Sequence, residues 1–165
     1  MTNKLAYLAI IQARLDSTRF PNKVMQTVNG KSMVKRVWEA AKYSFADKTV
    51  VAWPERYPEL DQNDVLGRFQ FISQEFPSKY IIRLTADCPL LSCKDINDAI
   101  REHTRTQVDY YNNNRDGFDV QIFPTDWLYD PDITHKEHVL SFGANVGGLS
   151  VNTPYDLLRV RNYAR

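Results

Sequence analysis

Six cations crowd into one short segment near the start of the chain. Between residues 12 and 36 there is one acid, Asp16, and the basic residues are Arg14, Arg19, Lys23, Lys31, Lys35 and Arg36. Arginine binds phosphate oxygens in bidentate fashion and lysine adds a point charge, so the segment could hold a triphosphate and stabilise departing pyrophosphate. A solvated basic loop would have the same composition. The segment lacks the Gly-rich run before Lys-Ser or Lys-Thr that marks a P-loop.

A carboxylate supplies the second candidate. Asp87 follows the β-rich run 80–84 and precedes Pro89 by two residues. Mg2+ keeps several waters, borrows phosphate oxygens and needs only one or two protein carboxylates, so Asp87 is a suitable ligand. The competing interpretation is an Asp that forms a turn ahead of a proline.

Alternating strand and helix signals surround these residues. The continuously apolar run 5–11 is typical of a strand buried on both faces of a parallel sheet. Two more strands and three capped helices follow. The expected strands are 5–11, 49–52 and 80–84, and the expected helices are 33–43, 65–74 and 96–103, with caps at Ser32, Asp64 and Ser92. This order predicts an α/β sandwich with ligands beyond the carboxyl ends of the strands, where the basic segment and Asp87 would meet.

The pattern changes after Val108. Short β-rich runs at 108–111 and 119–123, with a turn-rich segment between them, predict a small antiparallel excursion. A last strand at 149–151 and a helix that begins at Pro154 complete the expected elements. We find no repeat or linker, and therefore expect a single domain over residues 1–165.

The bulk composition argues against several classes of partner. Lys plus Arg is 21 and Asp plus Glu is 20, so no general affinity for nucleic acid or anionic membranes is indicated. The run 5–11 is too short to span a membrane and lacks the features of a signal peptide. Cys88 and Cys93 fit neither a disulfide framework nor a zinc site. We expect a cytoplasmic protein with reduced thiols that binds neither nucleic acid nor membrane.

The basic segment also resembles a family signature. Residues 11–24, IQARLDSTRFPNKV, and residues 29–33, NGKSM, are similar to the opening of the cytidylyltransferases, which include the CMP-Kdo and CMP-acylneuraminate synthetases. The spore-coat polysaccharide type is the most similar. The resemblance implies a Rossmann-like three-layer α/β/α nucleotidyltransferase fold of the GT-A-like kind, with a mostly parallel sheet. It further implies magnesium-dependent transfer of CMP from CTP to an acidic sugar, release of pyrophosphate, and a place in polysaccharide biosynthesis.

The resemblance assigns roles to individual residues. Arg14, Arg19 and Lys23 would hold the triphosphate, and the backbone near Gln12 would lie against the base. Residues 83–90, RLTADCPL, are similar to a second signature whose Asp binds magnesium, although the family usually has Gly where Ala86 stands. The expected nucleotide-binding set is Gln12, Ala13, Arg14, Ser17, Arg19, Lys23, Arg83 and Asp87, and the expected catalytic residues are Arg14, Lys23 and Asp87.

The closing signature carries one departure. Residues 151–157, VNTPYDL, place Asn152 where the family has a second metal-binding Asp. An amide oxygen can coordinate a hard cation but contributes no charge, so weaker magnesium binding is expected. By resemblance the sugar-site candidates are Asp119, Lys136, Glu137 and His138. For His138 the alternative is a helix-face histidine packed in the core.

Two other functions stay open. A catalytically impaired relative would bind nucleotide or sugar without turnover, as Asn152 suggests, and a nucleotidyltransferase of other specificity would use UTP or GTP. Members of the family commonly form homodimers, and a homodimer is expected here unless its interface lay in the segments that this chain lacks. Those gaps fall between residues 52 and 64 and between residues 139 and 149.

Overall fold

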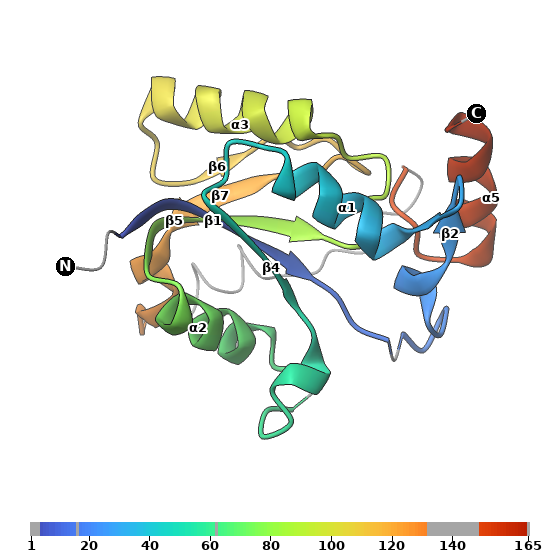
Figure 1. Ribbon diagram of the computed structural model, residues 1–165, viewed down its shortest axis with the longest axis horizontal. Coiled ribbons are helices and arrows are strands. Elements are labelled where there is room, and N and C mark those ends of the chain that lie inside the picture. The colour runs from blue at the N-terminus through green and yellow to red at the C-terminus, as the bar shows by residue number, and fades with distance from the viewer. Residues whose placement is uncertain (1–3, 16, 62, 132–148, 165) are drawn as a thin grey trace.

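The computed structural model describes residues 4–15, 17–61, 63–131 and 149–164. Its centre is a five-stranded sheet of order β4-β1-β5-β7-β6 (Figure 1). β1 (Leu5–Gln12) lies between β4 (Lys48–Ala52) and β5 (Ser78–Thr85) and is parallel to both. β7 (Gln121–Pro124) is antiparallel to β5, and β6 (Tyr111–Asn112) is antiparallel to β7. Only β7 therefore runs against the other four, and the predicted mostly parallel sheet with an antiparallel excursion is confirmed.

Helices cover both faces of this sheet. α1 (Met33–Lys42) and α3 (Cys93–Thr106) lie side by side on one face, and α2 (Val65–Glu75) lies on the other (Figure 1). Successive side chains of a strand point to opposite faces. Ala9 and Ile11 accordingly join the core under α1 and α3, whereas Leu8 and Ile10 join the core under α2. This two-sided burial explains why β1 is continuously apolar.

The helices begin at the predicted caps. The side chain of Asp64 accepts a hydrogen bond from Gly67 N at 2.7 Å, and Ser92 forms a capping box with Asp95. Such contacts satisfy backbone N–H groups that a first helical turn leaves unpaired. Because a cap directly precedes the first helical residue, α3 begins at Cys93 and not at residue 96 as predicted.

The loop between β1 and α1 contains a hairpin that we did not predict. β2 (Thr27–Val28) and β3 (Lys31–Ser32) pair in antiparallel fashion around Asn29 and Gly30, whose φ angles are 50° and 75°. Two successive residues of positive φ are what a tight type I′ turn requires, and Asn-Gly is its favoured sequence.

The last helix, α5 (Pro154–Tyr163), packs against that hairpin (Figure 1). Its Leu157 and Val160 belong to a small core with Val28 and Met33. The predicted strand at 149–151 is wrong, because this segment joins no ladder; instead, Val151 N donates to Asp87 O at 2.8 Å. The end of the chain is thereby attached to the loops that follow β1 and β5. No helix within the described ranges is long and apolar enough to cross a membrane.

Candidate functional site

The loops after β1 and β5 open beside each other at one edge of the sheet. Gln12, the last residue of β1, is in register with Thr85, the last residue of β5, and Ala86 N donates to Gln12 O at 3.0 Å. From β1 the chain first crosses to β4 on one side and later to β5 on the other. Such a switch point leaves a crevice at the carboxyl ends of the strands where ligands bind in α/β sheets. The predicted meeting of the two loops is therefore found.

Lys23 joins three segments at this edge. It begins the 3-10 helix η1 (Lys23–Met25), and its side chain is 11% exposed. Its Nζ lies 3.1 Å from Asp87 Oδ2, 3.0 Å from Val151 O and 3.4 Å from Asn152 Oδ1. Hydrogen bonds between ionised groups are stronger than neutral ones. One ammonium thus links the loop after β1, the loop after β5 and the entry to α5.

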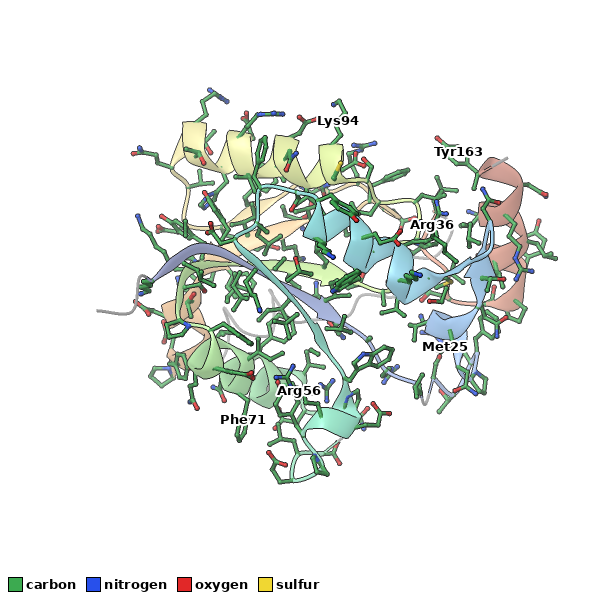
Figure 2. All side chains as sticks on the ribbon, viewed as in Figure 1. Met25, Arg36, Arg56, Phe71, Lys94 and Tyr163 are labelled. Atoms are coloured by element: carbon green, nitrogen blue, oxygen red, sulfur yellow. The ribbon has the colours of Figure 1, made fainter. Side chains whose placement is uncertain are left out.

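Two other cations of the basic segment have contacts within the fold. Arg36, labelled on α1 in Figure 2, donates from Nε to Pro89 O at 2.8 Å and from Nη1 to Val28 O at 3.3 Å. Lys31 forms an ion pair with Glu39 at 2.6 Å. Arg36 therefore fixes the hairpin and the Asp87 loop against α1, and Lys31 braces the hairpin on the same helix.

Arg14 and Arg19 remain on the exposed part of the loop. Arg14 Nη1 donates to Asn63 Oδ1 at 3.3 Å, and Ser17 between the two arginines is buried. Within the described residues no ion pair joins either arginine to Asp87. Of the three predicted triphosphate ligands, the structure thus brings Lys23 against Asp87 and leaves Arg14 and Arg19 on the outer part of the same loop.

Arg83 has an organising position under the site. It is buried in β5, and its guanidinium donates to Gln121 Oε1 at 2.6 Å and to Gln12 Oε1 at 3.1 Å. Burial lowers the pKa of Arg83, and the charge of Asp87 opposes that shift. Because arginine only donates, both carboxamide oxygens must face it and both NH2 groups turn elsewhere. Gln121 was not predicted as a site residue, since its place opposite Arg83 follows from the β5–β7 register.

The thiol of Cys88 lies between Asp87 and Asp119, a carboxylate predicted for the sugar site. The buried Cys88 Sγ donates to Asp119 Oδ2 at 3.4 Å and approaches Asp87 Oδ1 at 3.8 Å. Burial raises the pKa of Cys88 well above its usual value, so the thiol stays protonated. Burial also raises the pKa of Asp119, and the carboxylates of Asp116 and Asp87 add to that rise.

The remaining predicted residues divide into two groups. Ala13 is buried at the end of β1, and Ala86 is buried without a positive φ, so the Cβ that replaces the family's Gly is tolerated. Lys136, Glu137 and His138, the other sugar-site candidates, lie outside the described residues.

The oxygens around Lys23 suit a hard cation. A carboxylate, a backbone carbonyl and an amide oxygen converge there, and oxygen is the ligand atom that Mg2+ and related ions prefer. Across the described part of the chain, no group of three or more His, Cys, Asp or Glu side chains is arranged to hold a metal. A divalent ion at Asp87 and Asn152 would therefore depend on water or ligand oxygens to complete its shell.

Sequence comparison places a family signature at the start of the chain. Residues 8–53 match the family described as Cytidylyltransferase. Over 47 residues the chain is 47% identical to a 3-deoxy-manno-octulosonate cytidylyltransferase of Pseudomonas syringae pv. tomato. That match covers 28% of this chain and 18% of the relative, so it spans less than a fifth of the relative's length.

Structural comparison extends the likeness to nearly the whole chain. A cytidylyltransferase from Leptospira borgpetersenii superposes with a TM-score of 0.76 at 19% identity, covering 95% of this chain and 85% of that one. A CMP:2-keto-3-deoxy-manno-octonic acid synthetase complexed with CTP gives 0.69 at 15% identity, covering 96% and 98%. A Mycobacterium tuberculosis protein complexed with manganese gives 0.65 at 12% identity, covering 96% and 99%. Identities this low concern the fold alone, and they confirm the predicted Rossmann-like nucleotidyltransferase architecture.

Proposed function

We propose that the chain belongs to the cytidylyltransferase family, as its opening signature and its fold indicate, and that it transfers CMP from CTP to a sugar and releases pyrophosphate. One observation carries the proposal: a cation of the loop after β1 and the carboxylate of the loop after β5 meet at 3.1 Å at the switch point of the sheet. That is where a triphosphate and its counter-ion would need to be held together.

In the proposed reaction, a sugar hydroxyl oxygen attacks the α-phosphorus of CTP. The bond from that phosphorus to the bridging oxygen breaks, pyrophosphate leaves, and the hydroxyl proton passes to water. Lys23 and the exposed Arg14 and Arg19 bind the β- and γ-phosphates and stabilise the charge of the leaving group. Their contribution is positioning and electrostatics and requires no covalent intermediate.

The residues around Lys23 fit a divalent ion, Mg2+ in this proposal. Asp87 and Asn152, with the carbonyl of Val151, would hold it, and when bound it supplies charge neutralisation at the phosphate oxygens. Asp87 provides the formal charge of this set. The Mycobacterium tuberculosis protein of similar fold, which was solved with manganese, supports a divalent ion in this fold.

The acceptor in this proposal is an acidic sugar, as the name of the Pseudomonas relative suggests. Asp119 lies close enough to Asp87, through Cys88, to accept a hydrogen bond from a sugar hydroxyl beside the reacting phosphate. Arg83 holds Gln12 and Gln121 so that their NH2 groups can donate to the base or the sugar. A homodimer, a cytoplasmic location and a role in polysaccharide biosynthesis remain predictions.

The test is pyrophosphate release from CTP in the presence of Mg2+ or Mn2+ and a panel of acidic sugars. We expect release that needs both the metal and one acidic sugar, and that is lost in Asp87→Asn. Lys31→Gln is the matched control, because it removes one cation from the same segment without touching Asp87. Release with UTP or GTP in place of CTP would contradict the proposed base specificity.

A second candidate function is nucleotide binding without turnover. It is favoured by Asn152, which leaves one formal negative charge among the three oxygens at Lys23. Under this alternative CTP binds, no sugar releases pyrophosphate, and Asn152→Asp restores release. A wild-type chain that already turns over would exclude it.

A further inference from the structure

We propose that the Lys23 ammonium acts as the counter-ion of Asp87 and thereby keeps divalent metal out of the site. A triphosphate would bind the ammonium, draw it away from Asp87 and so let the metal enter. The inference deepens the proposed function and rests on it for the identity of the triphosphate. The Lys23 ammonium lies 3.0 to 3.4 Å from all three oxygens that would bind the metal, namely Asp87 Oδ2, Val151 O and Asn152 Oδ1. The predicted phosphate ligand thus occupies the predicted metal position.

The charges of these groups prevent a divalent ion from binding while the Lys23 ammonium is in place. Asp87 brings one negative charge, and the carbonyl of Val151 and the amide of Asn152 bring none. The ammonium of Lys23 already neutralises the set, so a dication beside it would meet net repulsion in a partly desolvated place. The side chains of Lys23 and Asp87 are 11% and 26% exposed, so bulk water screens the repulsion only in part.

A triphosphate reverses this balance. It offers Lys23 new oxygens, and it brings enough negative charge to compensate both the ammonium and a dication. Lys23 stands at the start of a short 3-10 helix, and its flexible four-carbon stem lets the ammonium turn from Asp87 toward a phosphate without refolding of the loop. Metal and triphosphate should then bind cooperatively, each raising the affinity for the other by the same factor.

Asn152 strengthens the exclusion. An aspartate at this position would leave one negative charge after Lys23 had been neutralised, and a dication could then bind beside the ammonium. With Asn152 the metal-binding set has no charge to spare. Asn152→Asp is therefore expected to weaken the dependence of metal binding on nucleotide.

The experiment is titration of Mn2+ into the nucleotide-free full-length chain, with free Mn2+ followed by electron paramagnetic resonance. We expect wild type to bind weakly and Lys23→Gln to bind at least about tenfold tighter, since the neutral side chain leaves Asp87 uncompensated. Lys31→Gln is the matched control and should behave as wild type. Asp87→Asn added to Lys23→Gln should abolish the gain, which assigns the binding to this site. Circular dichroism of each variant checks that the fold is kept.

Two results would overturn the inference. One is equal Mn2+ affinity in wild type and Lys23→Gln, whether both bind or neither does. The other is that a non-hydrolysable CTP analogue binds to wild type but does not raise its affinity for Mn2+. This measurement uses wild type alone, so it is valid even if Lys23→Gln does not fold. Neither readout depends on a sugar or on turnover. If the Mn2+ titrations give the expected results but wild type releases no pyrophosphate, the proposed function is refuted and the inference about Lys23 is not.

Discussion

The two ends of β1 and β5 carry polar groups of opposite character. At the carboxyl ends, Lys23, Asp87 and Asn152 form a charged and partly exposed set contributed by three loops. At the amino ends, Tyr7 of β1 stacks on Tyr80 of β5 with ring centroids 5.4 Å apart, and Tyr7 OH lies 3.0 Å from Nδ1 of the buried His103. The same strands thus end in a set of charges on one side and in a packed neutral set on the other.

One sheet thereby places the groups for ligand binding at one end and groups for stability at the other. The amino-end set, which we call the tyrosine–histidine cluster (Tyr7, Tyr80 and His103), ties α3 to the sheet through ring contacts and hydrogen bonds. Its groups are neutral and packed, so changes there should affect the free energy of unfolding. The carboxyl-end set consists of charged groups held in place by the fold, so changes there should affect ligand binding and catalysis more than stability.

The largest effect is expected at the carboxyl end. Asp87→Asn should lower the rate of pyrophosphate release by about 100-fold or more, because it removes the charge that would hold the metal at the phosphates. The melting temperature should fall only modestly, since the amide still accepts a hydrogen bond from the Lys23 ammonium although the charge of its partner is lost. Steady-state kinetics and a thermal melt of the same preparation check both parts. A large loss of stability with a normal rate in the folded fraction would contradict the proposal that the carboxyl-end groups serve binding and catalysis more than stability.

The next effect belongs to the amino end. His103→Ala should lower the free energy of unfolding by about 2 to 3 kcal/mol, because it empties a packed position and removes one of the two hydrogen-bond partners of the Tyr7 hydroxyl. Activity per folded molecule should match wild type. Urea denaturation gives the stability, and an unchanged midpoint would show that the tyrosine–histidine cluster does not stabilise the fold.

A smaller effect concerns acid. Burial lowers the pKa of His103, so the folded chain holds the ring neutral where the unfolded chain would protonate it. The contribution to stability is complete above the ordinary pKa of about 6.5 and is lost as pH falls below that value toward the lower folded pKa. Wild type should therefore lose stability more steeply than His103→Gln from about pH 6.5 downward. Parallel slopes in urea denaturation across this range would contradict the assignment.

The smallest effect is expected for Lys31→Gln. The Lys31–Glu39 pair is exposed, and ion pairs of this kind contribute little to stability. Neither pyrophosphate release nor the melting temperature should change measurably. A strong loss of CTP affinity in this variant would show that the whole basic segment, and not Arg14, Arg19 and Lys23 alone, binds the phosphates.

Much of the fold could be predicted because local signals and tertiary packing agree. The apolar run of β1, the cap at Asp64 and the Ser92 capping box each gave an element that the structure confirms. The hairpin around Asn29 and Gly30 was missed although its turn sequence is a strong signal, and the strand at 149–151 was wrong. That segment is apolar because Val151 enters the core beside α5, which sequence alone does not distinguish from a strand.

The sequence predicts which two loops form the site, but it does not predict the individual contacts between their residues. The place of Lys23 and Asp87 at the ends of β1 and β5 follows from sheet topology, which the order of elements indicates. The role of the Val151 carbonyl, and that of Gln121 beside Arg83, depends on the path of the chain end and on strand register. Neither leaves a local trace in the sequence. Charge alone also did not separate Arg36, which braces the fold, from Arg14 and Arg19.

The most direct test of the central claim, that Lys23 and Asp87 share one site for a triphosphate and its metal, is calorimetric titration of CTP with saturating Mg2+ into wild type and Lys23→Gln. We predict that the variant binds CTP at least about tenfold more weakly, a loss of about 1.4 kcal/mol, although its affinity for Mn2+ alone rises. Equal CTP affinity in the two proteins would contradict the account.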